Sequence, residues 1–228
     1  PPSAPPALTV RVCDGITCEM MGAASLLEEL VTRYGAGTDV RIVHAPCVGA
    51  CDRAPVAVVG QRQIHFAETV TVADAADAGN TSADLPDYID LDAYRMDGGY
   101  VVWNACRNGE RDHNEVINAV DHSGLRGLGG AGFPTARKWG FLKGTPKPRL
   151  IAINADEGEP GTFKDRHCFE TDPHRVLEGI LIAAWAVEAE AAYIYLRDEY
   201  PQCRDLLLME IARLESENMT GILEHSLM

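Results

Sequence analysis

A chain of 228 residues is longer than most single domains, and a hydrophobic share of 46% is enough to fill a core, so two compact domains are expected and a disordered protein is excluded. The formal net charge of −14 would repel the backbone of a nucleic acid and an anionic membrane surface, so neither is expected as a partner. The longest apolar run, residues 180–187, is far shorter than the roughly 20 residues that cross a bilayer, so no membrane insertion is expected.

The chain opens without a basic segment followed by an apolar one, so no secretory signal is predicted and the cytoplasm is the expected compartment. It contains seven cysteines, an odd number. Without export, a disulfide framework is less expected than metal ligation or free thiols.

The N-terminal part predicts a small α/β unit, taken as residues 8–78. Strands are indicated by alternating or β-branched apolar residues, and a helix by apolar residues at helical spacing. In chain order the predicted elements are a strand at 8–12, a helix at 20–34, and strands at 40–44, 55–59 and 61–66.

Four cysteines form two pairs, Cys13-x4-Cys18 and Cys47-x3-Cys51, and each pair is expected in a loop after a strand. Four converging thiolates suit an iron–sulfur cluster, and loops can direct backbone N–H groups at the sulfur atoms. Structural zinc is the strongest competing interpretation, although a four-residue spacing is less typical of it; two disulfides and unrelated thiols are further alternatives. The remaining cysteines have no ligand-like spacing and are expected as buried or free thiols: Cys106, Cys168 and Cys203.

Residues 79–92 mix Gly, Asn, Ser, Pro and Asp with little periodicity, and residues 79–95 are predicted to link this unit to a second domain at residues 96–228. The second domain alternates helices and strands, which makes the whole an α/β protein. Its predicted elements are helices at 110–122, 134–141, 173–190 and 200–217 and buried strands at 149–154 and 192–196.

A glycine loop, Gly127-Leu-Gly-Gly-Ala-Gly132, satisfies the pattern G-x-G-x-x-G. A Rossmann loop follows a strand, however, and here a helix that stops near Gly124 precedes the loop, so the Rossmann assignment is rejected. The glycines still allow backbone amides to approach an anion or a flat ring, and a helix starting at Pro134 offers its positive end. A turn with no ligand is the alternative.

Side chains that could assist a cofactor lie beside this loop and after the next strand. Lys138 would neutralise a phosphate, whereas Phe133 and Phe141 present flat rings for stacking, with core packing as the alternative. An acidic loop after the strand at 149–154 suits hydrogen-bond donors such as ribityl or ribose hydroxyls, a flavin N–H or a carboxamide, and a solvated loop is its alternative. Its polar residues are Asn154, Asp156, Glu157 and Glu159.

The cysteine motifs, Val12-Cys-Asp-Gly-Ile-Thr-Cys18 and Ala45-Pro-Cys-Val-Gly-Ala-Cys51-Asp52, resemble the thioredoxin-like [2Fe-2S] ferredoxin domain of NADH dehydrogenases. The resemblance covers residues 8–78. It implies that Cys13, Cys18, Cys47 and Cys51 ligate one [2Fe-2S] cluster, and it ranks the cluster well above zinc.

The segments 124–135 and 154–165, with Lys138-Trp139, resemble the FMN/NADH-binding subunit of respiratory complex I. This resemblance implies an FMN site at Gly127, Gly129, Gly130, Lys138, Asn154, Asp156 and Glu157, and contacts with NADH at Phe133, Phe141 and Glu159. Ala131 and Gly158, within the same motifs, complete the predicted cofactor-binding set. Relatives often carry Arg where this chain has Leu128, a change that weakens phosphate contacts but spares the backbone amides.

The combination of both parts, with Arg197-Asp-Glu-Tyr-Pro201, most resembles the beta subunit of NAD-dependent molybdenum- or tungsten-containing formate dehydrogenases. It implies a diaphorase with [2Fe-2S], FMN and NAD as cofactors and a formate-oxidising catalytic subunit as partner, with no catalytic side chain of its own. NAD-reducing hydrogenase and complex I-like NADH dehydrogenase are the near alternatives, and a zinc-binding adaptor is the non-enzyme alternative.

Part of the family pattern is expected to be absent from this chain. The FMN/NAD-binding domain is expected to be incomplete at the C-terminus, with [4Fe-4S] only in the missing part and residues 215–228 departing from the pattern.

Overall fold

The structure is a computed structural model that describes residues 6–35, 39–220 and 224–227. The chain forms two compact units, each built from several segments. The first unit comprises Pro1–Pro86, Asp156–Glu170 and Arg197–Leu206, and the second comprises Asp87–Ala155, Thr171–Leu196 and Leu207–Met228. The α/β class expected from the sequence is confirmed.

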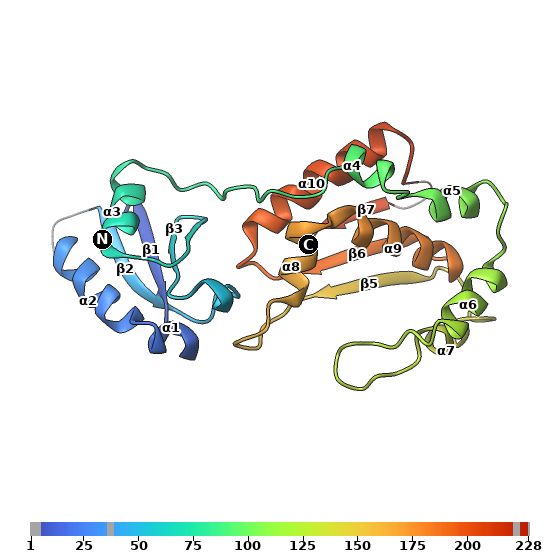
Figure 1. Cartoon of the computed structure of the whole chain (residues 1–228), viewed down its shortest axis with the longest axis horizontal. Coiled ribbons are helices and arrows are strands. Elements are labelled where there is room, and N and C mark those ends of the chain that lie inside the picture. Colours follow the sequence, from blue (N-terminus) through green and yellow to red (C-terminus); the bar gives the residue numbers. More distant parts are fainter. Residues whose placement is uncertain (1–5, 36–38, 221–223, 228) are drawn as a thin grey trace. The chain divides into compact units, whose positions relative to one another are not determined.

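The first unit contains a four-stranded sheet in the order β2-β1-β3-β4 (Figure 1). Parallel pairing joins β1 to β2, and antiparallel pairing joins β1 to β3 and β3 to β4. Helix α2 packs against β1 and β2, and α3 packs against α2 and β3, over a core that includes Val10, Leu30 and Val72. The bounds are β1 Leu8–Cys13, α2 Ala23–Arg33, β2 Val40–Ala45, β3 Ala57–Val59, β4 Arg62–Ile64 and α3 Thr69–Asp77.

The element boundaries in this unit differ from the predicted ones where the backbone changes direction. Gly22 adopts φ +97°, so the helix predicted at 20–34 begins only at Ala23 and is preceded by a separate short helix, α1 Ile16–Met20. The strand predicted at 55–59 begins at Ala57, because Pro55 has no N–H to give to a ladder.

The segment predicted as a linker contains a helix, α4 Leu91–Met96. The Asp90 carboxylate accepts a hydrogen bond from the Ala93 amide at 2.8 Å, so an aspartate whose neighbours indicate a linker is in fact a helix N-cap. The last residues of the segment predicted as a linker therefore form part of a short helix.

The second unit contains a parallel sheet in the order β5-β6-β7, and α9 packs against β5 and β6 (Figure 1). Helices α4, α5 and α6 pack on α9, and α7 packs on α6. The bounds are α5 Val101–Arg107, α6 His113–His122, α7 Thr135–Gly140, β5 Leu150–Ala155, α9 Pro173–Ala186, β6 Ala191–Leu196 and β7 Glu224–Leu227. Two helices have residues in both units, α8 Lys164–Thr171 and α10 Pro201–Ser216.

The strand β5 is less buried than predicted. Leu150, at its start, is 58% exposed, and exposed residues alternate along the strand with partly buried ones. Helix α9 packs against β5, and every second residue of the strand remains exposed: Leu150, Ala152 and Asn154. No helix in the described ranges combines the length and apolar composition needed to cross a bilayer.

A buried carboxylate, Glu178 on α9, holds the start of α5. It accepts hydrogen bonds from the Tyr94 hydroxyl at 2.7 Å, the Tyr100 amide at 2.9 Å and the Trp103 amide at 3.2 Å. Both amides lie at the N-terminus of α5, where backbone N–H groups have no partner within their own helix. Glu178 is thus a helix cap supplied by another helix.

The neighbouring His174, also on α9, is fully buried between two polar partners. Its Nδ1 lies 2.9 Å from the Tyr100 hydroxyl, and its Nε2 lies 2.9 Å from the Glu210 carboxylate. Burial lowers the pKa of His174, and the Glu210 carboxylate opposes that shift. The side chain therefore acts as a buried hydrogen-bonding link between α9 and its neighbours.

We expect Glu178→Gln to destabilise the second unit by about 2 kcal/mol. One carboxylate oxygen becomes an NH2 group, which cannot accept the hydrogen bond that this oxygen accepted. Urea unfolding followed by tryptophan fluorescence measures this, since Trp103, Trp139 and Trp185 all lie in the second unit. The exposed Glu110 provides the control, and Glu110→Gln should keep the wild-type midpoint. Equal midpoints for both variants would contradict the capping role.

Candidate functional site

The paired cysteines meet because of the strand order. β1 and β2 run parallel with Cys13 opposite Ala45, so the chain leaves both strands at the same edge of the sheet. Cys13 is the last residue of β1, and Cys47 lies two residues beyond the end of β2. The two motifs therefore begin side by side.

Close packing brings the two cysteine motifs into contact. A Cβ built on Gly15 would lie 3.2 Å from the Cys47 Cβ and 3.4 Å from the Cys13 Sγ. A larger residue at this position would therefore crowd both cysteines. The Sγ atoms of Cys47 and Cys51 lie 3.4 Å apart. Cys18 is buried and hydrogen-bonds the Cys13 thiol, so thiols of both motifs gather at this edge of the sheet.

The second cysteine of each pair does not lie in an irregular loop as predicted. Cys18 lies on α1, and Cys51 begins a 3-10 turn at Cys51–Arg53. A tight helical turn reverses the chain within the short spacing of each pair and returns the second thiol toward the first.

Backbone amides point at the thiols and favour their charged form. The hydrogen bond with Cys18 lowers the pKa of Cys13 to about 6, and the amides of Gly15 and Val48 act in the same direction. Burial raises the pKa of Cys47 to about 11, and the amide of Gly49 opposes that shift. Amides aimed at sulfur suit a site whose thiols must be held as thiolates.

The alternatives to a cluster differ in how well they fit this arrangement. All seven cysteines are free thiols, so the two-disulfide arrangement is not present. In the part of the chain that the structure describes, no group of three or more His, Cys, Asp and Glu side chains is arranged to hold a metal ion. A [2Fe-2S] cluster asks for two thiolates at each iron, which the two pairs offer.

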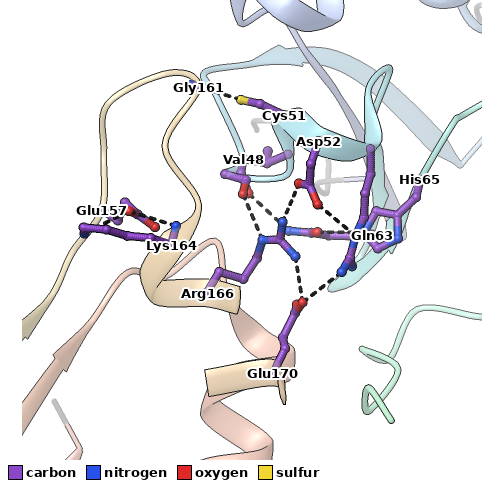
Figure 2. A network of polar contacts seen from close by, with 12 residues as sticks. Val48, Cys51, Asp52, Gln63, His65, Glu157, Gly161, Lys164, Arg166 and Glu170 are labelled. Atoms are coloured by element: carbon purple, nitrogen blue, oxygen red, sulfur yellow. Dashed lines mark hydrogen bonds and ion pairs between the residues drawn. The ribbon is translucent and has the colours of Figure 1, made fainter. Parts of the chain in front are cut away.

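A buried arginine, Arg166 on α8, packs against the Cys47–Cys51 motif. Its side chain is 1% exposed; its Nε donates to the Gly49 carbonyl at 3.0 Å and its Nη1 donates to Glu170 at 2.6 Å (Figure 2). It also pairs with the Asp52 carboxylate, which directly follows Cys51. Arg166 therefore joins α8 to the backbone and to a side chain of the motif.

A second arginine, Arg53, completes a network of alternating charge with Arg166 and two carboxylates. It donates to the same Glu170 oxygen as Arg166, at 3.1 Å, and its Nε lies 3.4 Å from the Asp52 carboxylate. The network thus contains two arginines and two carboxylates, and each arginine contacts both acids. Its charges balance within the first unit.

Arg197, which follows β6, is another buried arginine at the Cys47–Cys51 motif. Its Nη2 donates to the Cys47 carbonyl, its Nη1 donates to the Glu157 carbonyl at 2.6 Å, and its Nε donates to Glu199 at 2.9 Å. One side chain therefore holds both a predicted cluster ligand and the acidic loop.

Tyr200 fills the space beside the same motif. Its ring is fully buried and packs against Gly49, which adopts φ +73°. A Cβ on Gly49 would overlap this ring, so both the backbone conformation and the close approach require glycine. The Arg197 guanidinium lies 5.7 Å from the centre of the Tyr200 ring.

One predicted ligand also receives a hydrogen bond from the segment that follows the acidic loop. The Gly161 amide donates to the Cys51 Sγ at 3.2 Å (Figure 2). The sequence pattern does not indicate Gly161, Arg166 or Arg197 as part of this site. The sequence feature that could have pointed to these residues is that polar segments directly follow the strands β5 and β6, because loops after strands often carry binding residues.

The glycine loop lies in the second unit and is closed at its base. The Gly127 amide donates to the Phe133 carbonyl and the Thr135 amide to the Leu125 carbonyl, both at 3.0 Å. Gly130 adopts φ +97°, a conformation that favours glycine. A Cβ built on Gly130 would meet nothing within 4 Å, and the same holds for Gly129 and Gly132, so the space beside this backbone is open to a ligand.

Two aromatic members of the predicted set lie together beside the glycine loop. The rings of Phe133 and Phe141 are 5.9 Å apart and are 40% and 61% exposed. The Arg137 guanidinium lies 5.8 Å from the centre of the Phe133 ring, a contact that the sequence pattern does not predict. Lys138 is exposed in the last turn of α7, and Ala131 is exposed in the loop itself.

The acidic loop begins where β5 ends. Asn154 belongs to the second unit and is exposed; Asp156, Gly158 and Glu159 belong to the first unit and are exposed as well. Glu157 differs, because its buried carboxylate accepts hydrogen bonds from the amides of residues 164 and 165 at 3.1 and 3.0 Å (Figure 2). It caps the start of α8, a role that the sequence pattern does not assign.

Two family models match the chain. Residues 3–78 match the thioredoxin-like [2Fe-2S] ferredoxin family, and residues 120–225 match the Nuo51 FMN-binding domain. The expected departure of residues 215–228 from the family pattern is therefore wrong as far as residue 225.

Curated relatives share sequence with more than half of the chain. It is 44% identical over 142 residues to a component of the NADH-quinone oxidoreductase of Rhizobium meliloti (strain 1021), which is 62% of this chain and 34% of that protein. It is 50% identical over 131 residues to a component of the NADH-quinone oxidoreductase of Aquifex aeolicus (strain VF5), which is 58% of this chain and 30% of that protein. The chain thus spans about a third of the length of these relatives.

A solved structure matches the chain along nearly its whole length. The crystal structure of an NAD+-reducing [NiFe]-hydrogenase in the air-oxidized state aligns with a TM-score of 0.78 and 27% identity. The alignment covers 99% of this chain and 43% of that one, so both units have counterparts in a single longer chain.

Proposed function

We propose that this chain is the electron-transfer part of an NAD-dependent diaphorase. It carries a thioredoxin-like [2Fe-2S] domain followed by an FMN-binding domain of the Nuo51 type. The observation that carries the proposal is the meeting of two cysteine pairs in close contact at one edge of the first sheet. The proposed cluster ligands are Cys13, Cys18, Cys47 and Cys51.

The proposed flavin contacts lie in the glycine loop and the acidic loop. The chemistry that FMN supplies when bound is the exchange of a hydride for single electrons, so no general base is needed. The open backbone beside Gly129 and Gly130 would approach the ring or phosphate, and Lys138 would neutralise phosphate charge.

Two of the proposed contacts with NAD(H) lie next to the glycine loop. Phe133 and Phe141 offer exposed rings for the nicotinamide or the adenine, because flat aromatic side chains stack on flat rings. The exposed Glu159 offers a hydrogen-bond acceptor for a carboxamide or a ribose hydroxyl.

A molybdenum- or tungsten-containing formate dehydrogenase subunit is the proposed partner, and the cytoplasm the proposed location. The support for this partner is the resemblance of segments 124–134 and 197–201 to beta subunits of that enzyme class. A hydrogenase partner is the second candidate, favoured by the match with the NAD+-reducing hydrogenase along 99% of the chain. The relatives in NADH-quinone oxidoreductase support a complex I-like partner in the same way.

Purification of the chain with its native partners tests the proposal. Visible absorption, electron paramagnetic resonance after reduction, and flavin fluorescence of a boiled extract report the cluster and FMN separately. Reduction of NAD+ by formate or by hydrogen then identifies the partner. A colourless preparation that contains zinc instead of iron would replace the diaphorase by a zinc-binding adaptor.

A further inference from the structure

The first unit encloses the Cys47–Cys51 motif with residues that lie outside the 3–78 match. Two carbonyls of this motif, at Cys47 and Gly49, accept hydrogen bonds from Arg197 and Arg166. Both arginines come from segments that follow strands of the second unit's sheet. The surroundings of the predicted cluster ligands are therefore completed by the part of the chain that matches the FMN-binding family.

The two arginines face different acids, and Arg166 shares its acids with Arg53. Arg166 contacts two carboxylates, Asp52 and Glu170, within the balanced network. Arg197 has one carboxylate partner, Glu199, whose side chain is 30% exposed and thus partly screened by water. Its two other hydrogen bonds go to neutral carbonyls.

A positive charge held near a cluster favours the form that has gained an electron. The side chain of Arg197 is 7% exposed, so its field is weakly screened, and it is hydrogen-bonded to the carbonyl of a predicted ligand. Hydrogen bonds to ligand sulfur act in the same direction, and the Gly161 amide supplies one to Cys51. Both features raise a reduction potential.

We propose that Arg197 is a positioning residue that holds the Cys47 backbone and raises the reduction potential of the [2Fe-2S] cluster through its buried charge. The proposal rests on the cluster assignment made above. It makes the potential depend on a residue of the FMN-binding part, since Arg197 also holds the Glu157 carbonyl of the acidic loop.

The test is a redox titration of the full chain, with the reduced cluster followed by electron paramagnetic resonance. In Arg197→Gln, which keeps an amide donor but loses the charge, we expect the equilibrium constant for reduction to fall about tenfold, or about 59 mV for a one-electron couple. Arg197→Lys keeps the charge and should stay near the wild-type potential. The control is Arg204→Gln, which removes an exposed charge from the same unit and should leave the potential unchanged.

A variant of Glu199, the acid that pairs with Arg197, is a second test of the effect of the Arg197 charge on the potential. Glu199→Gln keeps the shape of the side chain but removes the carboxylate that compensates Arg197. We expect the potential to rise in this variant, because the guanidinium charge is then opposed by no acid of its own. A fall or an unchanged potential in Glu199→Gln would contradict the role of the charge.

The cluster assignment and the role of Arg197 fail in different ways. A wild-type chain without a cluster would refute the cluster assignment. An intact cluster in Arg197→Gln with the wild-type potential would overturn the role of Arg197 alone. If the Arg197 variants purify without their cluster, the change of reduction potential in Glu199→Gln tests the role of the Arg197 charge instead.

Discussion

We expect the Cys18→Ala variant to purify without a [2Fe-2S] cluster. Cys18 is buried on α1 and hydrogen-bonds Cys13, so its removal leaves one iron of the cluster with a single protein thiolate. An alanine at this position offers no atom that can bind iron. Iron and acid-labile sulfide per chain, with visible absorption, measure the loss.

Cys203→Ala is the matched control for that variant. Cys203 is also a fully buried thiol of the first unit, but it lies on α10, outside both cysteine pairs. We expect this variant to keep its iron. Full cluster content in Cys18→Ala would remove Cys18 from the ligand set, and zinc retained by both variants would favour the adaptor.

The local part of this site can be predicted from the sequence. The strand that ends at Cys13 and the strand that ends at Ala45 are short segments of alternating or β-branched residues, and the cysteines follow each at close spacing. Such information lies within a few residues of each cysteine. Helix α9 is equally predictable, because its apolar residues recur at helical spacing after a proline.

The contacts that enclose the Cys47–Cys51 motif cannot be predicted in this way. Arg197 is 150 residues from Cys47, and Arg166 is 114 residues from Asp52, so no periodicity or spacing links them. The capping role of Glu157 is hidden for a related reason. An acidic residue that caps a following helix has the same local sequence as one that accepts hydrogen bonds from a ligand.

We expect Arg166→Met to destabilise the first unit by about 3–5 kcal/mol. The change leaves Arg53 as the one cation of the network facing both Asp52 and Glu170, and it leaves the Gly49 carbonyl without its arginine donor. Thermal unfolding followed by circular dichroism and by bleaching of the cluster absorption measures the effect. The transition of the first unit should fall by more than about 10 °C.

Arg204→Met is the matched control for Arg166→Met. Arg204 belongs to the same unit, but its side chain is exposed and pairs with the adjacent, exposed Asp205. Such surface pairs contribute little to stability, so the transition of the first unit should stay in place. Equal transitions in the two variants would show that the buried network adds no stability.

A double variant separates lost charge balance from lost packing. Glu170 is 5% exposed and also accepts hydrogen bonds from Arg53 and Gln202, so it keeps two donors when Arg166 is absent. Glu170→Gln alone should destabilise the first unit, because Arg166 then lacks one charged partner. Combined with Arg166→Met it removes a poorly compensated carboxylate, so the double variant should lose less stability than the sum of the single variants. If the stability losses of the two single variants simply add, Arg166 acts by packing alone. A smaller loss in the double variant would show that the alternating charges hold α8 against the cysteine motif.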